Sequence, residues 1–398
     1  MLHTFQLSDY PILLAPLEET LPAWLQQHDY SQIFIVTDDN IREHSLPLLW
    51  QKTGLSPKIP LVIVPTGELH KTLATCEYIW QAMFAARLDR KALVVNLGGG
   101  VIGDMGGFCA ATFKRGVDFI QIPTTLLAMT DAAIGGKLGI DFQGIKNAVG
   151  VFRNPAAVFV DPAFLHTLPA RELRSGFAEV VKHALIGAPG LWETIRAMQA
   201  NQLTPDSTDW HDLLCASIAV KVRVVTEDPL EKGLRALLNY GHTIGHAIES
   251  YFLHTEHPLT HGEAVAIGMI CEGPLTPPPT PPLKGRGDVE GGVEYNLTHS
   301  TEDVAVYSTS PLPFRGGVGG GVGGDGVSSV ILRHFGHRPI PESSFPALWE
   351  LMLQDKKNTS GAVRIAVPDA EPFSISIPEL TRAEMERRLR YYNALELL

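Results

Sequence analysis

The sequence contains little cysteine, and its cysteines are far apart. Four occur in 398 residues, at positions 76, 109, 215 and 271, and no two form a Cys-x-x-Cys pair. Neither a disulfide framework nor a thiolate zinc site has support, because both need clustered or regularly spaced cysteines. We therefore expect reduced thiols in the core.

The sequence also lacks a long apolar run and an excess of positive charge. No uninterrupted hydrophobic stretch approaches the roughly 20 residues that cross a bilayer, and the first ten residues show no signal-peptide pattern. The formal net charge is −11, which argues against nonspecific nucleic-acid binding and against a basic membrane patch. We therefore expect a cytoplasmic protein with no membrane or nucleic-acid partner, and locally gathered basic residues if the substrate is an anion.

What the sequence does contain is enough for two domains, with 45% hydrophobic and 19% charged residues. In the first third, short β-branched runs at 32–37, 60–65 and 92–97 are separated by longer segments with helical spacing, such as 71–87. This alternation is typical of a parallel sheet with crossover helices. We predict an α/β, Rossmann-like parallel-sheet domain over residues 1–165.

Beyond about residue 161 the strand pattern fades and helical spacing dominates. Apolar residues recur at helical intervals over 171–186, 213–225 and 235–252. We therefore predict a second, mainly α-helical metal-binding domain over residues 166–398, with the catalytic cleft between it and the sheet domain.

A glycine-rich sequence follows the third predicted strand. The motif Gly-x-Gly-x-x-Gly spans residues 98–103, where backbone amides can approach a pyrophosphate without an obstructing Cβ. Asp38, at the end of an earlier strand, could accept hydrogen bonds from ribose hydroxyls. Together they predict a dinucleotide site. The alternative is a tight glycine turn with a capping aspartate.

Histidines in the second half are spaced as metal ligands are. His242 and His246 are four residues apart, so that on a helix both imidazoles share one face, and His261 follows in a separate segment. Three ligands that leave a position open are typical of catalytic zinc. Such pairs also occur on helix surfaces without a metal. Close packing is nevertheless indicated by the neighbouring glycines, which are poor helix formers: Gly241, Gly245 and Gly262.

A segment from about 273 to 326 does not fit the helical pattern. Residues 274–283 contain six prolines and residues 316–326 contain eight glycines, compositions that neither continue a helix nor fill a core. An imperfect repeat relates 282–293 to 311–322, and two copies are too few for a solenoid. We predict a disordered low-complexity insertion here.

In their order along the chain, these motifs resemble those of the 3-dehydroquinate synthases, a family within the sugar phosphate cyclase group. The resemblance covers nearly everything outside 273–326, and the shared order of so many motifs argues against coincidence. It is carried by residues 98–104, 115–117, 123–131, 135–137, 146–147, 177–182, 235–249 and 261–265.

The resemblance implies an enzyme, a phosphorus–oxygen lyase of the shikimate pathway, which leads to chorismate and the aromatic amino acids. Such enzymes convert 3-deoxy-D-arabino-heptulosonate 7-phosphate, an anionic sugar phosphate, into 3-dehydroquinate and phosphate. They use NAD and a divalent metal, zinc or cobalt. The reaction runs through transient oxidation, phosphate elimination, reduction and intramolecular aldol closure, with no net oxidation.

The resemblance also implies roles for individual residues. The metal ligands would be Glu179, His242 and His261. The groups at the reacting centre would be His246, Lys137, Asp131, Lys182, Lys221 and Arg235, with further substrate contacts from Arg115, Asn147, Asn239 and Lys356. The NAD contacts would be Asp38, Asn40, Glu68, Lys71, Gly99, Gly100, Val101, Asp104, Thr124, Thr125 and Lys146. Arg115 would reach the phosphate of a partner subunit, so a homodimer is expected.

One stretch departs from the family pattern. In the family, the helix that begins near His261 runs on into another helix, whereas here the Pro/Gly-rich repeat replaces that stretch and helical sequence resumes near Val327. We expect reduced stability and retained chemistry, because His261, the last implied metal ligand, precedes the break. Lys356 follows the Pro/Gly-rich stretch, so it is the implied substrate contact whose placement is at risk.

Three other functions share parts of this apparatus. Another sugar phosphate cyclase, making an inosose or a valiolone, would differ at substrate-end residues that here favour dehydroquinate, such as Lys146, Asn147, Arg235 and Asn239. A metal-dependent polyol or glycerol phosphate dehydrogenase would release NADH in proportion to substrate. A noncatalytic NAD-binding remnant, inactivated by the insertion, would come out of purification without metal.

Overall fold

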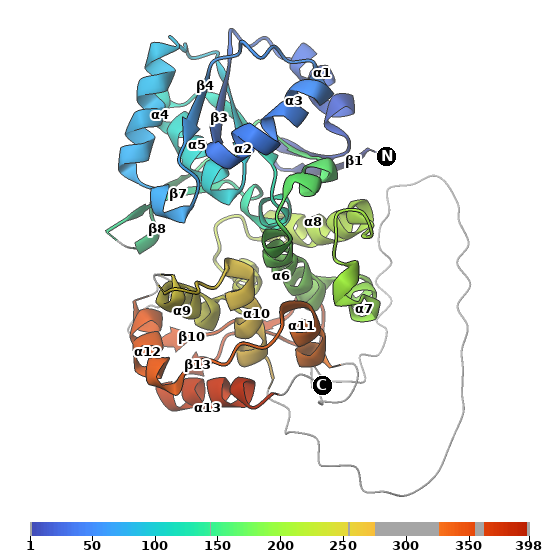
Figure 1. Cartoon of the computed structure of the whole chain (residues 1–398), viewed down its shortest axis with the longest axis vertical. Coiled ribbons are helices and arrows are strands. Elements are labelled where there is room, and N and C mark those ends of the chain that lie inside the picture. The colour runs from blue at the N-terminus through green and yellow to red at the C-terminus, as the bar shows by residue number, and fades with distance from the viewer. Residues whose placement is uncertain (1, 144, 254, 275–325, 355–361, 396–398) are drawn as a thin grey trace, which may run out of the picture.

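The computed structural model describes residues 2–143, 145–253, 255–274, 326–354 and 362–395. An α/β layer lies at the top of Figure 1, and a mainly helical layer lies below it. The predicted fold class, a parallel-sheet part followed by a helical part, is confirmed. Among the described residues, no helix combines the length and the apolar composition needed to cross a membrane.

A seven-stranded sheet forms the centre of the α/β layer. Its order is β1-β2-β9-β6-β5-β3-β4, and neighbouring strands are parallel except β1 and β2. The three predicted runs form β3, β4 and β5. The strand bounds are β1 (His3–Leu7), β2 (Tyr10–Leu14), β3 (Ile33–Asp38), β4 (Leu61–Val64), β5 (Leu93–Gly98), β6 (Asp118–Pro123) and β9 (Ala157–Val160).

Both faces of this sheet are buried, because successive side chains of a strand point to opposite sides. Phe34 and Val36 of β3 pack in one core with α4 and α5, whereas Ile35 between them packs in the other core with α1 and α3. This second core continues into the helical layer and so holds the two layers together. The helix bounds are α1 (Leu17–Gln26), α2 (Asp39–His44), α3 (Leu46–Thr53), α4 (Leu73–Ala85) and α5 (Gly100–Thr112).

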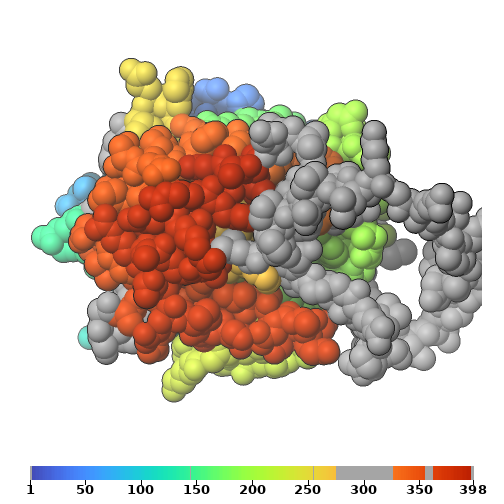
Figure 2. Space-filling view, turned by 90° about the horizontal axis from the view of Figure 1, so that it is seen from below, coloured from blue at the N-terminus to red at the C-terminus, as the bar shows by residue number. Residues whose placement is uncertain are grey.

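The second layer is built mainly of α-helices. Two of the predicted helices, 171–186 and 213–225, are α6 and α8. The helices are α6 (Ala170–Gly187), α7 (Pro189–Ala197), α8 (Trp210–Glu227), α9 (His242–Phe252), α10 (His261–Glu272), α11 (Val327–Phe335), α12 (Phe345–Leu353) and α13 (Arg382–Asn393). Seen from below, α12 and α13, in orange and red, form this end of the molecule (Figure 2).

Short elements complete the described chain. Strands β7 (Lys137–Phe142) and β8 (Ile145–Phe152) form a separate antiparallel hairpin. Two further pairs are β10 (Val363–Arg364) with β13 (Glu379–Leu380), and β11 (Val367–Pro368) with β12 (Ile375–Ser376). The short 3₁₀ and π helices are η1 (Glu68–His70), η2 (Phe113–Arg115), η3 (Ala128–Ala132), η4 (Pro162–Thr167), η5 (Ala200–Gln202), η6 (Leu234–Asn239) and η7 (Glu342–Ser344).

The prediction of one continuous helix over 235–252 was wrong. The chain forms η6, then extends at Tyr240 and turns through Gly241, whose φ of +77° is left-handed, before α9 starts at His242. A left-handed residue ends regular helix, and glycine adopts it without a Cβ penalty. The break places His242 at the first position of α9.

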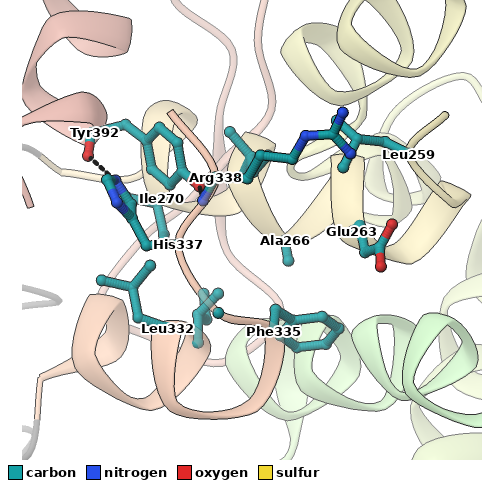
Figure 3. Close-up of a pocket in the computed structure, with 12 residues that line it drawn as sticks. Leu259, Glu263, Ala266, Ile270, Leu332, Phe335, His337, Arg338 and Tyr392 are labelled. Carbon is teal, nitrogen blue, oxygen red and sulfur yellow. Dashed lines mark hydrogen bonds between the residues drawn. The ribbon is translucent and has the colours of Figure 1, made fainter. Parts of the chain in front are cut away.

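Helix α11 begins at Val327, where the sequence predicted that helical structure resumes. Residues 275–325, which hold most of the predicted insertion, lie outside the described residues. Helix α11 packs against α10, and a cavity of about 110 Å³ lies between them, closed by Tyr392 of α13 (Figure 3). Its α10 wall is a single helix face, formed by Glu263, Ala266, Ile267 and Ile270.

Glycines bring α6, α9 and α10 unusually close together, as the sequence indicated. A Cβ on Gly262 would lie 1.9 Å from the backbone oxygen of Ser175 in α6, and one on Gly245 would lie 3.1 Å from the backbone of α10. A Cβ on Gly268 would lie 1.9 Å from the backbone oxygen of Gly241. Side chains at these positions would force the three helices apart.

We predict that Gly262→Ala lowers the free energy of unfolding by about 1–3 kcal/mol, the usual cost of overpacking. Gly190→Ala is the matched control, because no heavy atom lies within 4 Å of a Cβ there, and we expect a change within about 0.5 kcal/mol. Denaturant unfolding of both variants measures the difference. Equal midpoints would show that α6 and α10 can separate without cost.

Candidate active site

The residues implied in NAD binding gather at the carboxyl edge of the sheet. Asp38 ends β3, Glu68 and Lys71 follow β4, and residues 99–104 follow β5. Thr124 and Thr125 follow β6. Because these strands are parallel, their carboxyl ends share one edge, and the order reverses between β3 and β5, where such sheets bind ligands.

A buried lysine connects several members of this set. The Nζ of Lys71 donates to Asp104 Oδ2 and to Asn147 Oδ1, each at 2.6 Å. Burial alone would lower the pKa of Lys71, but Asp104 and Glu68 raise it above its usual value, so the ammonium stays charged. Asn147, implied as a substrate contact, therefore lies within the nucleotide set.

Asp38 has the capping role that was the alternative interpretation. Its Oδ1 accepts the Ile41 amide at 2.9 Å, at the start of α2, and the Thr66 hydroxyl at 3.2 Å. A carboxylate offers two oxygens with about four acceptor sites. Capping α2 and binding a ribose are therefore compatible.

The glycine motif forms the beginning of α5. The helix starts at Gly100 directly after β5, and Gly99 is its N-cap without a side-chain cap. A Cβ on Gly99 would lie 3.1 Å from Thr125 Cγ2, and one on Gly100 would lie 3.1 Å from Ala132 Cβ. Small residues thus keep the first turn of α5, which includes Val101, accessible to an anion at the helix N-terminus.

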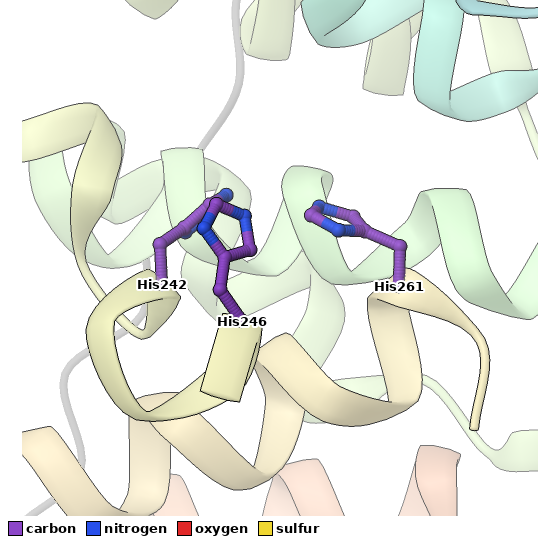
Figure 4. A group of neighbouring side chains, drawn as sticks. All are labelled: His242, His246 and His261. Atoms are coloured by element: carbon purple, nitrogen blue, oxygen red, sulfur yellow. The ribbon is translucent and has the colours of Figure 1, made fainter. Parts of the chain in front are cut away.

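The three histidines converge from two helices. His242 and His246 lie one turn apart on α9, and His261 is the first residue of α10 (Figure 4). Their ring centroids are 5.0 to 5.7 Å apart, and one nitrogen of each ring lies within 4.8 Å of the others. The sequence spacing therefore does produce a cluster that can ligate a metal.

Glu179 of α6 reaches this cluster from a third helix. It is fully buried, and its Oε1 lies 3.5 Å from His242 Nε2 and 3.6 Å from His261 Nε2. Neither carboxylate oxygen makes a hydrogen bond of good geometry. Burial would raise the pKa of Glu179, but Lys182 and His261 lower it. A buried, charged carboxylate facing two imidazoles fits a Zn²⁺ or Co²⁺ ion, whose preferred donors are nitrogen and oxygen.

The second nitrogen of each of these imidazoles is also engaged. His242 Nδ1 lies 3.0 Å from the Tyr240 backbone oxygen, and His261 Nδ1 lies 3.1 Å from Glu249 Oε2. Such outer partners fix the tautomer and leave Nε2 for a metal. Burial alone would lower the pKa of His261, but Glu249 and Glu179 raise it to about 10.

Glu249 belongs to the candidate site by its contacts, and the sequence reasoning gave it no role. Its Oε1 accepts from Lys146 Nζ at 2.7 Å, so it connects the nucleotide set to His261. Burial would raise its pKa, but His261 and Lys146 lower it far below the usual range. The available signal was its position on α9, three residues after His246 and seven after His242, which places all three on one helix face.

The basic residues implied at the reacting centre lie between the two layers, each held by an oxygen partner. Lys182 pairs with Glu179 and donates to the Leu238 backbone oxygen at 2.8 Å. Lys221 donates to Asp131 at 2.5 Å. Burial lowers the pKa of Lys221, so it is a cation short of solvation that an anionic ligand would stabilise.

A second carboxylate orders the remaining contacts. Glu231 pairs with Lys137 and accepts from Asn239 Nδ2 at 3.0 Å. The Arg235 guanidinium donates to the backbone oxygens of Pro229 and Gly135, at 2.7 and 3.3 Å. The sequence reasoning gave Glu231 no role, because its partners lie on other elements.

A further buried histidine adjoins the same centre. His183 lies beside Asp131 and Glu179, and its Nδ1 is 2.8 Å from the Ser217 hydroxyl. Burial, reinforced by Lys182, lowers its pKa to about 3. His183 is therefore neutral at physiological pH and adds no positive charge for an anionic ligand.

One implied residue, Arg115, is not brought to this centre. Arg115 follows the far end of α5, about 20 Å from its first turn, and is exposed beside Asp89, Arg90 and Lys114. Lys356 lies outside the described residues. The cavity of Figure 3 contains none of the implied site residues, so it is separate from this centre.

Known proteins share both the sequence and the fold. The family models for the N-terminal and C-terminal regions of 3-dehydroquinate synthase match residues 61–175 and 176–277. The 3-dehydroquinate synthase of Parabacteroides distasonis is 42% identical over 261 residues, which are 66% of this chain and 73% of that protein.

Two solved structures share the fold across nearly the whole chain. A 2-deoxy-scyllo-inosose synthase with carbaglucose-6-phosphate, NAD⁺ and Co²⁺ is 21% identical, with a TM-score of 0.73 over 98% of this chain and 99% of that one. A 2-epi-5-epi-valiolone synthase from Streptomyces hygroscopicus subsp. jinggangensis with NAD⁺ and Zn²⁺ is 22% identical, with a TM-score of 0.73 over 98% of each chain. The two family models together match more than half of this chain. The Parabacteroides distasonis enzyme is 42% identical to it over 73% of that enzyme's length. The chain therefore belongs to the 3-dehydroquinate synthase family.

Proposed function

We propose that this chain converts 3-deoxy-D-arabino-heptulosonate 7-phosphate into 3-dehydroquinate and phosphate with NAD and a divalent metal. Family membership supports the reaction. One observation of the structure carries the proposal: Glu249 contacts Lys146 of the nucleotide set with one oxygen and His261 of the metal cluster with the other. A nicotinamide and a metal would therefore act on the same substrate carbon.

Glu179, His242 and His261 would hold the metal, Zn²⁺ or Co²⁺. When bound, such an ion acidifies a substrate hydroxyl and so favours loss of hydride from its carbon to NAD. Tyr240 and Glu249 orient the two imidazoles through their Nδ1 atoms. His246, half-buried beside His242, is placed to exchange a proton with the substrate, because imidazole both donates and accepts.

The cations bind the anionic ends of the substrate. Arg235 offers a planar fork suited to a carboxylate or phosphate, and Lys137 and Lys221 offer point charges. All three are held by protein oxygens before substrate arrives, so little ordering is needed on binding. The negative charges of the substrate would then neutralise these partly buried cations.

We further propose a cytoplasmic homodimer with a domain boundary near residues 165 and 166. Arg115 is exposed and lies at the far end of α5 from the candidate site of its own chain, as expected of a residue that serves the phosphate of a partner subunit. The four cysteines are all unpaired thiols, which suits a reducing compartment.

The two rival activities are separated by the products. We predict that the protein, supplied with this sugar phosphate and catalytic NAD, releases phosphate without accumulating NADH, and that chelator abolishes the release. Phosphate assay and absorbance of NADH follow both products in one sample. NADH in proportion to substrate would identify a dehydrogenase, and turnover of an inosose or valiolone precursor instead would identify another cyclase.

We predict that Lys137→Met lowers kcat/KM for the sugar phosphate by about 10–100-fold, since a hydrogen bond to a charged group contributes roughly 1.5–3 kcal/mol. Its side chain is 43% exposed, so folding should survive. Lys91→Met, at 74% exposure, is the matched control and should leave the kinetics unchanged. Steady-state kinetics of both variants decide; equal values would remove Lys137 from substrate binding.

We predict that Glu249→Gln weakens metal affinity by about 10–100-fold, the usual effect of losing an outer carboxylate of a ligating histidine. Glu227→Gln is the control, because Glu227 pairs only at the surface with Arg223 in α8. Competition of the metal-loaded proteins with a chelator of known affinity gives both constants. If both variants release metal alike, Glu249 does not orient His261.

A further inference from the structure

The helix that carries His242 begins without a cap of its own. Its N-cap is Gly241, which has no side chain to accept the orphan amides of the first turn. A side chain cannot be added there, because a Cβ on Gly241 would lie 2.6 Å from Met269 Cγ and 2.9 Å from the backbone oxygen of Val265. The packing of α9 against α10 therefore excludes a local cap.

A carboxylate from the end of α10 takes this role. Glu272 Oε2 accepts the Gly241 amide at 2.8 Å, and Glu272 Oε1 accepts the Ile244 amide at 2.7 Å. These are the N-cap and N3 amides of α9, which flank His242 on both sides. Glu272 is fully buried, and a buried carboxylate is sustained by charge-assisted bonds of this kind.

The other histidine helix shows what the contact replaces. At the start of α10, Thr260 Oγ1 accepts the Glu263 amide at 3.3 Å, and Glu263 Oε2 accepts the Thr260 amide at 2.8 Å. This local capping box satisfies the same two amide positions around His261. Both histidines are thus first residues of helices whose N-cap and N3 amides are fixed, one locally and one from about thirty residues away.

We propose that Glu272 is a positioning residue for the metal site: it fixes the first turn of α9 so that His242 Nε2 faces Glu179. The inference rests on the proposed role of His242 as a metal ligand. Glu272 accepts the Gly241 and Ile244 amides, so it acts through the backbone of residues 241–244. It is also the last residue of α10, directly before the Pro/Gly-rich sequence.

The test is Co²⁺ titration of metal-free, full-length protein, followed by visible absorbance and by thermal unfolding of the same samples. Glu272→Gln keeps the shape of the side chain but replaces one carboxylate oxygen by an –NH₂ group. That group cannot accept a hydrogen bond, so one of the two backbone amides loses its acceptor. We expect Co²⁺ affinity to fall about 10–100-fold and the absorption bands to shift. Glu272→Asp retains the charge and should fold even if the Gln variant does not; because it is shorter, we expect an intermediate loss of affinity.

Leu389→Ala is the matched control. Leu389 is buried in α13, which packs on α10, and it accepts neither of the α9 amides that Glu272 accepts, so the substitution should lower the unfolding temperature and leave Co²⁺ affinity within about threefold. Wild-type affinity and spectrum in both Glu272 variants would overturn this proposal alone, as would an equal loss in Leu389→Ala. If the wild-type protein bound no Co²⁺, both the metal assignment and the proposed role of Glu272 would be overturned.

Discussion

The buried carboxylate of Glu179 is the constraint on which the rest of the site depends. A charged group without solvent is costly unless opposite charges or a metal surround it. Here the compensation comes from Lys182 on the same helix and from imidazoles on two other helices. Three helices must therefore meet within a few ångströms of one point, and the contacts at Gly262 and Gly268 are what allow that approach.

The placement of the histidines at helix N-termini adds an electrostatic effect. A helix N-terminus carries partial positive charge, which disfavours a protonated imidazole and favours a nearby anion such as Glu179. A neutral imidazole is the form that binds a metal. In the metal-free state the carboxylates of Glu249 and Glu179 oppose this effect and hold His261 protonated. The site is thus balanced between binding a proton and binding a divalent cation, with the same nitrogen involved in each.

Local patterns predicted much of the fold and part of the site. β3, β4 and β5 were visible as β-branched runs, and the shared face of His242 and His246 followed from helical periodicity. The start of α9 was not predictable, because it depends on a left-handed turn at Gly241, where Val265 and Met269 of another helix leave no room for a Cβ. Glu231 and Glu272 could not be found either, since their partners lie on other elements and only the folded chain brings them together.

The unusual sequence between α10 and α11 is compatible with this site for a topological reason. α11 packs on the face of α10 that contains Ile267 and Ile270. The first helix after this sequence therefore lies against the last helix before it. Closure entropy grows only logarithmically with the number of residues between two packed elements, by about 0.6 kcal/mol for each doubling, so added length between α10 and α11 costs little. Glu179, His242 and His261 all precede it. Glu272 links the end of α10 to the metal cluster, because the residue that ends α10 also fixes the beginning of α9.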